Sequence, residues 1–402
     1  MVVFASMSSP LPAPLRARVI GAGPTGALAA LALAEAGWIV DLADSLSAAD
    51  LQRRHRAYAL THSSRQLLER LQLWAHLEPL LVPFHHLHLL DAALARSVDF
   101  SSADLASAPT AAAPVGWIVR HGPLMALLLD RLARHPGVTL QLGAGLSEGE
   151  SSGWDLVVAA DGPNSSTRGA LGIGCWGWTY RQSCLTAEVD LRGAGVATAW
   201  EVLRPEGPFA VLPLGEGHFQ LVWSAPQASN SRREALEPAA FLDGLAAVLP
   251  DGLEPDALLD QPRAFPAGLQ LAHRLSRGST VLVGESAHRC HPVGGQGLNL
   301  CWRDVAVLHR LALRAAAGSL PAHQLGAAYG RRRWPDLLLI LLSTDALVRL
   351  FSSRHPLLLG LRRPVLALLA AKPALRQMLL AVMTDGRPRL RPRPAVASLA
   401  PW

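Results

Sequence analysis

Residues 16–44, RARVIGAGPTGALAALALAEAGWIVDLAD, alternate between apolar runs and glycines. ARVI is an apolar run of strand length, ALAALALAEAG favours a helix, and WIVDLAD is apolar again with an acid at its end. Gly37 follows the helical run, at the position where a left-handed glycine commonly ends a helix. The pattern predicts strand, helix and strand in that order, which is a β-α-β unit.

Helical and strand-like patterns continue along the chain. Apolar positions have helical spacing over 64–77 and 122–135, and strand-like runs cover 138–145 and 154–162. From about residue 175 to 270 the pattern changes to short β-like runs between glycine and proline turns. We therefore expect an antiparallel sheet inserted into an α/β frame.

The C-terminal third is predicted to be largely helical from residue 320 onward, ending in a Pro/Arg-rich tail, 386–402, that we expect to be disordered. Residues 337–383 are rich in leucine. Basic residues interrupt them, among them Arg349, Arg354, Arg362, Arg363 and Lys372. Two interpretations stay open, namely helices that lie on a membrane surface with cations toward anionic headgroups, or a bundle packed on the rest of the protein.

The composition limits the class of protein. Half of the 402 residues are hydrophobic, enough for one large domain or two joined domains. The formal net charge is +6, but the cations are almost all scattered arginines, so no nucleic-acid-binding face is indicated. Four cysteines without a CxxC motif favour a reducing cytoplasm. The N-terminus lacks a signal-peptide pattern, and no uncharged apolar run reaches the roughly 18 residues of a membrane span.

The first chemical motif is GAGPTG, in which Gly21, Gly23 and Gly26 fit GxGxxG between a strand and a helix. Gly21 permits the tight turn, Gly23 lets the backbone approach a pyrophosphate at the helix N-terminus, and Gly26 allows close helix–strand packing. Asp44 ends the second strand, where a carboxylate accepts hydrogen bonds from ribose hydroxyls. The arrangement predicts dinucleotide binding without separating FAD from NAD.

Two later segments separate these cofactors. VVAADGPNSSTRGALG places Asp161, Ser165 and Arg168 after an apolar run, and GESAHRCHPVGGQGLNL places Glu285 and several glycines between a strand and a helix. Together with GAGPTG, these segments resemble the single-component flavoprotein aromatic hydroxylases.

Within that group, RHRAYALTHSSRQLLERLQLW resembles the signature of the ubiquinone-biosynthesis hydroxylases (UbiH/VisC-like), with Arg56 as its arginine. The resemblance covers roughly residues 16–385. It implies an α/β fold: a Rossmann-like FAD-binding domain of the glutathione-reductase and p-hydroxybenzoate-hydroxylase type, an inserted, mainly antiparallel β-sheet substrate domain, and a C-terminal helical region. The expected division assigns 16–90, 116–172 and 273–320 to the FAD-binding domain, 91–115 and 173–272 to the substrate domain, and 321–385 to the C-terminal helices.

The expected cofactor-binding residues are Gly21, Gly23, Gly26, Asp44, Arg56, Arg120, Asp161, Glu285, Pro292, Gly295, Gln296, Gly297, Leu298 and Asn299. Glu285 would accept hydrogen bonds from ribityl hydroxyls, and the helix that begins near Gly297 would aim its positive end at the pyrimidine edge of the flavin. Arg56 and Arg120 are alternatively surface arginines. The alternative for Asp161, Ser165 and Arg168 is a structural role.

The family usually has Asp where this chain has Glu285. The extra methylene displaces the carboxylate by about one bond, so the ribityl contact must be rebuilt or bridged by water. Three outcomes stay open: a tolerated variant, weak retention of FAD, or a copy that no longer catalyses.

Histidines and tryptophans suggest other chemistry. His288, Cys290 and His291, and separately His85, His86 and His88, are ligand-type residues, but neither group has the spacing of a zinc site. We expect the first group at the flavin and the second on a loop or strand edge. There is no GxSxG elbow for a hydrolase. WGWTY resembles only part of the flavin-dependent halogenase motif.

The resemblance implies hydroxylation of a prenylated phenol or quinone precursor. NAD(P)H or another donor would reduce FAD, and O2 would add at flavin C4a to give the hydroperoxide that oxidises the ring. The expected substrate wall is Phe209, Leu212, Pro213 and Trp223, with ordinary core as the alternative, and no catalytic acid or base stands out. Other candidate functions are an FAD-dependent prenyl-chain reductase and a non-catalytic FAD-binding subunit of a quinone-biosynthesis complex. We expect a cytoplasmic protein, with peripheral membrane contact through the C-terminal helices.

Overall fold

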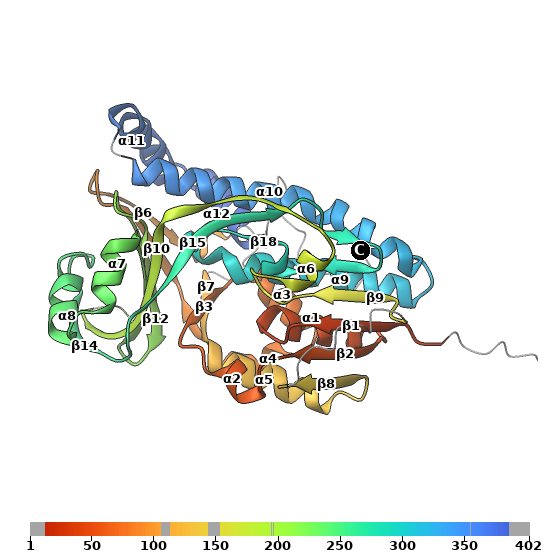
Figure 1. Cartoon of the computed structure of the whole chain (residues 1–402). Coiled ribbons are helices and arrows are strands. Elements are labelled where there is room, and N and C mark those ends of the chain that lie inside the picture. Colours follow the sequence, from red (N-terminus) through yellow and green to blue (C-terminus); the bar gives the residue numbers. More distant parts are fainter. Residues whose placement is uncertain are drawn as a thin grey trace, which may run out of the picture.

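The computed structural model describes residues 13–105, 113–143, 153–193, 195, 197–353 and 355–385. The expected disordered tail and the end of the 138–145 strand lie outside these residues. The described chain forms three sheets with long helices along one side (Figure 1). This arrangement confirms the predicted α/β class, with an inserted, mainly antiparallel sheet and a helical C-terminal region.

The first sheet has the strand order β16-β17-β9-β1-β2-β8 and is parallel except at β16. Its strands are β1 (Arg16–Ile20), β2 (Ile39–Asp44), β8 (Val138–Leu142), β9 (Leu156–Ala159), β16 (Ser276–Arg277) and β17 (Thr280–Leu282). The predicted β-α-β unit forms its centre, with α1 (Pro24–Glu35) joining β1 to β2.

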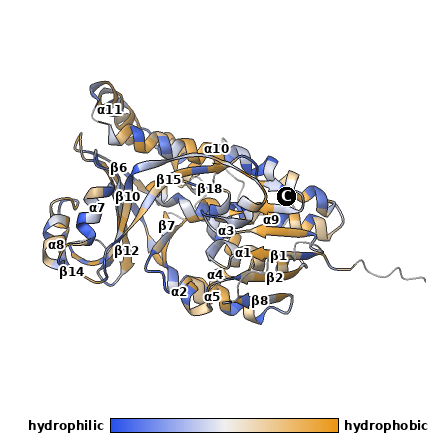
Figure 2. Ribbon diagram, in the orientation of Figure 1, coloured by the Kyte–Doolittle hydropathy of each residue, from blue (hydrophilic) through white to orange (hydrophobic). Residues whose placement is uncertain are grey.

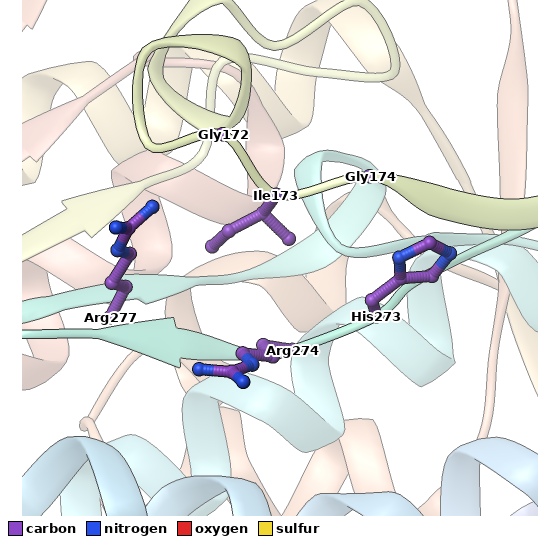
Figure 3. A pocket seen from close by; sticks show the side chains of 6 residues that line it. All are labelled: Gly172, Ile173, Gly174, His273, Arg274 and Arg277. Atoms are coloured by element: carbon purple, nitrogen blue, oxygen red, sulfur yellow. The ribbon is translucent and has the colours of Figure 1, made fainter.

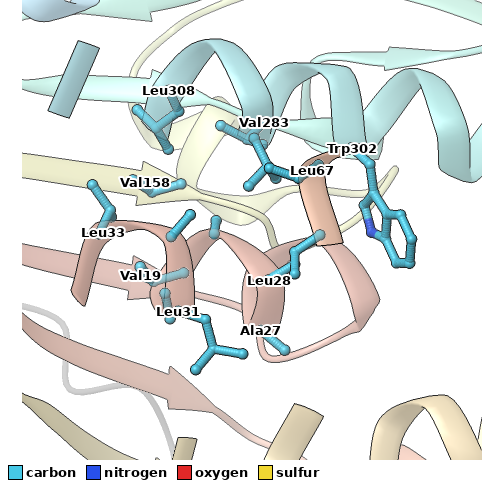
Figure 4. Close-up of a cluster of buried hydrophobic side chains, with 14 of the residues drawn as sticks. Val19, Ala27, Leu28, Leu31, Leu33, Leu67, Val158, Val283, Trp302 and Leu308 are labelled. Atoms are coloured by element: carbon cyan, nitrogen blue, oxygen red, sulfur yellow. The ribbon is translucent and has the colours of Figure 1, made fainter. Parts of the chain in front are cut away.

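Helix α1 is apolar on all sides because other elements cover it all round. It contacts the sheet, α5 (His121–Arg134) and α9 (Gln296–Ala316), and a helix without a polar face is typical of such full burial. Figure 4 shows Leu33 of α1 near Val158 and Leu308, and Leu28 of α1 belongs to the same buried cluster. This core fixes α1 and α9 against each other, and both helices begin at glycine-rich turns.

A three-stranded sheet, β3-β7-β4, lies beside the first. It is formed by β3 (Ala57–Leu60), β7 (Gly116–Arg120) and β4 (Val82–Phe84), and the helices α2 (Ala48–Gln52), α3 (His62–Arg70) and α4 (Trp74–Leu77) occur in the same part of the chain. The helical spacing over 64–77 is confirmed, but it gives two helices, α3 and α4, rather than one. The chain breaks at Gln72, which is exposed and has φ 54°, and this reversal buries Leu71, Leu73 and Trp74 together.

The largest sheet has nine strands in the order β18-β15-β10-β13-β12-β11-β5-β6, with β14 paired to β10. Only the β5–β11 pair is parallel. The strands are β5 (His86–Asp91), β6 (Arg96–Ser101), β10 (Cys175–Arg192), β11 (Thr198–Leu203), β12 (Phe209–Gly215), β13 (His218–Pro226), β14 (Glu254–Leu258), β15 (Arg263–Ala272) and β18 (His288–Arg289). Strand β10 is much longer than the short runs that the sequence predicted.

The two faces of this sheet bury different partners. Phe209 and Trp223 lie on the face covered by α7 (Gln227–Glu234) and α8 (Pro238–Ala246), and Trp223 contacts the ring of Phe241 at 6.3 Å. Their assignment to the substrate wall is therefore wrong, because both belong to an ordinary core. Pro213 is also buried. Leu212 lies on the opposite face and packs in a cluster with Ile118 of β7.

The C-terminal helices are α10 (Leu325–Ser352), α11 (Pro356–Ala371) and α12 (Pro373–Asp385), and the short α6 (Ser166–Ala170) follows β9. Figure 1 shows α10 running along one side of the molecule, with α11 at its end. Within the described residues, no single helix meets the length and hydropathy of a membrane span. Helix α11 and residues Pro373–Thr384 meet them only as a pair, bent by 99°.

Candidate active site

The three glycine-rich motifs meet where β1, β9 and β17 end. A side chain on Gly21 would place its Cβ 2.4 Å from the carbonyl oxygen of Ala160, and one on Gly26 would lie 1.8 Å from the Gly21 carbonyl oxygen. Gly21 also has φ 98°, which other residues rarely adopt. The first and second motifs therefore touch through backbone atoms that only glycine leaves room for.

Side-chain contacts join the second motif to the third. Arg168 Nη1 donates to the carbonyl oxygen of Ser286 (2.7 Å), and Ser165 Oγ accepts from the Arg168 backbone N–H (2.9 Å). Asp161 Oδ2 accepts a backbone N–H from the first turn of α6 (3.0 Å). These contacts give Asp161, Ser165 and Arg168 the structural role that was the alternative to cofactor binding. Asp161 Oδ1 is buried without a partner among the described residues, so a cofactor contact through it stays a prediction.

The third motif is held by a buried ion-pair network that the sequence did not reveal. Asp304 of α9 accepts from the backbone N–H of Gly284 (2.8 Å), from His288 Nε2 (2.7 Å) and from Arg333 Nε (2.6 Å). Arg333 of α10 also pairs with Asp336. Burial opposes ionisation of Asp304, but the neighbouring His288 and Arg333 lower its pKa overall. The network anchors the turn that carries Glu285 to two long helices.

The histidines expected at the flavin have hydrogen-bond partners within the protein. His288 pairs with Asp304, and His291 Nδ1 accepts the backbone N–H of Val293 (3.2 Å). Burial lowers the pKa of His291 to about 4, which keeps its ring neutral. The expected loop or strand edge is confirmed for His85, which lies between β4 and β5, and is wrong for His86 and His88, which lie on β5 between β11 and β6. No three His, Cys, Asp or Glu side chains in the described part of the chain are grouped to hold a metal ion.

Asn299 fixes the start of α9. Its Oδ1 accepts from Ser64 Oγ (2.7 Å) and from the Thr61 N–H (3.0 Å), and its Nδ2 donates to the carbonyl oxygens of Ala59 (2.7 Å) and Gly295 (2.9 Å). These bonds occupy both ends of the amide, so Asn299 joins α9 to β3 and α3. A further contact between Asn299 and a cofactor, through its backbone N–H, stays a prediction.

Two helix N-termini in this region lack side-chain caps. Helix α1 begins after Gly23, and a Cβ at Gly23 would meet nothing within 4 Å. Helix α9 begins after Gly295 (φ 62°), and Gly297 likewise has open space beside it. Uncapped N–H groups and the helix dipole favour anionic or electron-rich ligands. FAD would fit this arrangement, and the expected positions of its pyrophosphate at α1 and of the flavin pyrimidine edge at α9 stay predictions.

The other expected contacts surround these two helix ends. Asp44 Oδ2 accepts the Ala22 N–H (2.6 Å), which holds the carboxylate beside the first glycine turn. Pro292 leads into the short turn Val293–Gly295, which precedes α9. Gln296 Nε2 donates to the Gly294 carbonyl oxygen (3.0 Å), while Gln296 Oε1 is buried without a partner among the described residues. Leu298 is half-buried on the first turn of α9.

Glu285 is exposed, although Gly284 and Ser286 on either side of it are buried. Its charge contributes to raised pKa values at Tyr58 and Cys290, in both cases after burial as the main cause. The Glu285 carboxylate is therefore close enough to Tyr58 of β3 and to Cys290 for its charge to act on both. This position suits a carboxylate that accepts hydrogen bonds from a bound cofactor.

We expect Glu285→Gln to weaken FAD binding by roughly 10- to 100-fold, since a hydrogen bond to a charged acceptor contributes about 1.5–3 kcal/mol. We expect Glu285→Asp to change the dissociation constant by less than about threefold, because the charge remains. Both constants can be measured by flavin fluorescence titration of the apoprotein. The exposed Glu254→Gln serves as the control. A Glu285→Asp protein that binds FAD tenfold tighter would show that the native site is compromised.

The two candidate arginines lie where the sheets meet. Arg56 lies over the ring of Phe265 in the large sheet at 5.2 Å. Arg120 pairs with Glu188, also in the large sheet, so its guanidinium already has an anionic partner. Both side chains therefore join the two parts of the fold, and a direct contact with FAD stays a prediction for each.

A pocket of about 330 Å³ lies at the end of the second motif, beside Gly172 (Figure 3). Its lining is formed by Gly172, Ile173, Gly174, His273, Arg274 and Arg277. None of the residues expected to bind the cofactor lines this pocket. We therefore place the candidate site where the three motifs meet, because the residues expected to bind the cofactor lie there and not around the pocket.

Comparisons with known proteins identify relatives of this chain. A family described as "FAD binding domain" matches residues 147–334. The crystal structure of p-nitrophenol 4-monooxygenase PnpA from Pseudomonas putida shares the fold, with a TM-score of 0.73 and 20% identity over 91% of this chain and 96% of that one. The fold and the family match thus define the class, a protein with an FAD-binding domain.

Relatives in sequence narrow the class to a family. Ubiquinone hydroxylase UbiL of Rhodospirillum rubrum is 33% identical over 356 residues, covering 83% of this chain and 81% of that protein. The 3-demethoxyubiquinol 3-hydroxylase of Escherichia coli is 29% identical over 382 residues, covering 90% and 95%. The chain belongs to the family of FAD-dependent ubiquinone-biosynthesis hydroxylases. The predicted resemblance, the cofactor FAD and the oxidoreductase class are confirmed.

Proposed function

We propose that this protein hydroxylates the aromatic ring of a prenylated phenol in ubiquinone- or plastoquinone-type biosynthesis, with O2 as co-substrate and NAD(P)H as the expected reductant. The names of the relatives support the reaction and the substrate class. The bound FAD would supply electron transfer to O2 and delivery of one oxygen atom to the ring. The protein must orient the ring and exclude water.

One observation carries the proposal: the turn before α9 lies directly against the large sheet. The Gly294 N–H donates to Glu201 Oε2 of β11 (3.3 Å). Next to this contact the sheet presents Ala199, Leu212 and Leu214, which cluster with Ile118 of β7. An apolar sheet face beside the flavin site suits an aromatic ring with a hydrocarbon tail. The proposal keeps the division into FAD-binding and substrate domains given above, except that β5 joins the large sheet as a whole.

The genetic test is quinone profiling of a deletion strain. Loss of the gene should remove or reduce the mature quinone and accumulate a prenylated phenol that lacks one ring hydroxyl. Complementation with the wild-type gene should restore the profile. An unchanged quinone profile with no accumulated phenol would contradict the proposal.

A second part of the proposal concerns the membrane, where a prenylated substrate resides. Exposed apolar side chains follow α10, α11 and neighbouring β10: Trp176, Trp178, Leu338, Leu342, Leu357, Leu361, Val365 and Leu368. Figure 2 shows apolar residues along α10 and α11. Trp176 contacts the ring of Trp334 at 6.1 Å, and Arg349 lies over Trp178 at 4.9 Å, which joins β10 to α10. We call this the α10–α11 surface.

Cations border the α10–α11 surface. Arg349 is 60% exposed, and Arg363 and Lys372 are also exposed, as binding to anionic headgroups requires. The expectation of a cation that faces anionic headgroups is wrong for Arg362, because this residue is fully buried and pairs with Asp91 of β5. Arg354 lies outside the described residues. We propose peripheral contact with the inner face of the cytoplasmic membrane through this surface, and association with other enzymes of quinone biosynthesis.

We expect wild-type protein to float with anionic phosphatidylglycerol liposomes and Leu357→Glu/Leu361→Glu protein to float at least about tenfold less, since each buried leucine contributes roughly 1.5–3 kcal/mol. Both leucines are exposed, at 77% and 53%, so the variant should keep its fold and its FAD. The control is Leu236→Glu/Leu259→Glu, two exposed leucines elsewhere. Equal flotation of all three proteins would rule out this surface.

A further inference from the structure

A buried carboxyl group lies beside the flavin site, on a residue that no sequence motif includes. Glu201 is in the middle of β11 and is 8% exposed. Its neighbours across the sheet are Leu89 on β5 and Ala210 on β12, both apolar. Because side chains alternate along a strand, Glu201 points to the face opposite Trp200 and Val202, which pack in the core under α7 and α8. Glu201 thus faces the flavin site.

Only one hydrogen bond to Glu201 is present among the described residues. The Gly294 N–H donates to Oε2 (3.3 Å), and Oε1 has no partner there. Gly294 has φ 69° and belongs to the turn Val293–Gly295, and Val293 packs in one apolar cluster with Leu203 of β11. The Glu201 carboxylate therefore meets the turn before α9, beside the site where the proposed function requires the aromatic ring.

Asp304 shows what a structural buried carboxyl looks like in this protein. It accepts three hydrogen bonds, two from side chains that can be positively charged, and its pKa is lowered. Burial raises the pKa of Glu201 to about 7, which its single bond from Gly294 only partly offsets. A buried carboxyl with one weak partner costs stability in the ionised state, and such groups are concentrated at functional sites.

We propose that Glu201 binds the phenolic hydroxyl of the substrate and accepts its proton. This inference rests on the proposed function and names the residue that acts on the ring. The phenol O–H bond breaks, its electron pair stays on the phenolate oxygen, and the proton moves to Oε1 of Glu201. The phenolate then donates electron density to the ring carbon that forms the new bond to oxygen. The proton leaves Glu201 when the product departs.

The ionisable groups around Glu201 do not change the pH dependence expected from its ionisation. They are Cys184 on β10, which the charge of Glu201 affects only as a minor cause, His291 before the turn, and the buried Asp91–Arg362 pair between β5 and α11. Burial raises the Cys184 pKa to about 11, and His291 stays neutral, so neither changes charge near pH 7. Hydroxylation should therefore rise with pH as Glu201 ionises near pH 7.

The test uses FAD-loaded protein, reduced with dithionite and then mixed with oxygenated buffer and 2-(3-methylbut-2-enyl)phenol. We expect Glu201→Gln to keep its FAD and its melting temperature, to lose roughly 100-fold in the single-turnover rate, and to lose the pH dependence between pH 6 and 8. Glu201→Asp should retain the pH dependence at a reduced rate. The exposed Glu254→Gln is the matched control and should behave as wild type.

A second readout does not need turnover. Binding of the phenol to oxidised wild-type protein at pH 6.5 should release a fraction of a proton, detectable with an indicator dye in weak buffer, because the phenol favours ionised Glu201. Glu201→Gln should release none. Equal proton release and an equal pH profile in the two proteins would overturn the role of Glu201 while hydroxylation itself stands. If wild-type protein makes no hydroxylated product, the proposed function fails instead.

Discussion

Gly26→Ala is expected to give a protein that retains no FAD and unfolds at a lower temperature. The added Cβ would lie 1.8 Å from the Gly21 carbonyl oxygen and 3.1 Å from the Ala160 Cβ, and the nearer atom belongs to the backbone. Backbone shifts of this kind typically cost about 1–3 kcal/mol, sometimes more. Here the shift would also separate the two motifs that form the cofactor site. Flavin absorbance of the purified protein and its thermal unfolding measure the two effects.

Substitutions at two other glycines distinguish a loss of stability from a loss of cofactor binding. Gly23→Ala should fold normally, because its Cβ meets nothing within 4 Å, yet should bind FAD poorly if the pyrophosphate lies there. Gly244→Ala on α8 also has open space and should change neither property. Full FAD content in Gly26→Ala would contradict the packing argument. Full FAD content in Gly23→Ala would contradict the position of the pyrophosphate.

Asp304→Asn is expected to have the largest effect on stability, about 3–5 kcal/mol, because it removes the charge between His288 and Arg333 in a buried site. It should also loosen the Gly284 turn and weaken FAD binding. The exposed pair Arg192–Asp256 provides the control, and Asp256→Asn should cost at most about 1 kcal/mol. Chemical denaturation of both variants gives the comparison. Equal stabilities would contradict the anchoring role of the network.

The pH dependence of this network has a defined sign. Because the pKa of Asp304 is lower in the folded protein than in the unfolded chain, its stabilising contribution is present above its unfolded value of about 4. The contribution is lost as the pH falls through the folded pKa. Asp304→Asn should therefore reduce the difference in stability between pH 7 and pH 3. An unchanged difference would show that other groups determine acid unfolding.

The sequence alone predicted the features that depend on residues close together along the chain. GAGPTG predicted its strand, helix and strand, because glycine positions and apolar periodicity act over a few residues. The three motifs also predicted the family, since each has a fixed spacing. The contacts between Gly21 and Ala160 and between Arg168 and Ser286 show that these motifs form one site.

The sequence was insufficient where distant residues meet. Nothing local marks Asp304 and Arg333 as partners, since one lies on α9 and the other on α10. Glu201 occurs in TAWEVL, a strand pattern with one acid, and only the turn before α9 gives it significance. Phe209 and Trp223 are core residues because α8 covers their side of the sheet, and the sequence does not reveal which side α8 covers. Pairing of elements, rather than their formation, was the missing information.

The most direct test of the account is a single turnover under ¹⁸O2. FAD-loaded, reduced protein is mixed with a prenylated phenol, and the product is analysed by mass spectrometry. The account predicts a product that carries one ¹⁸O atom on the ring and retains its prenyl double bond. A product reduced in the prenyl chain without label, or formed without oxygen, would contradict it, as would a purified protein that binds no FAD.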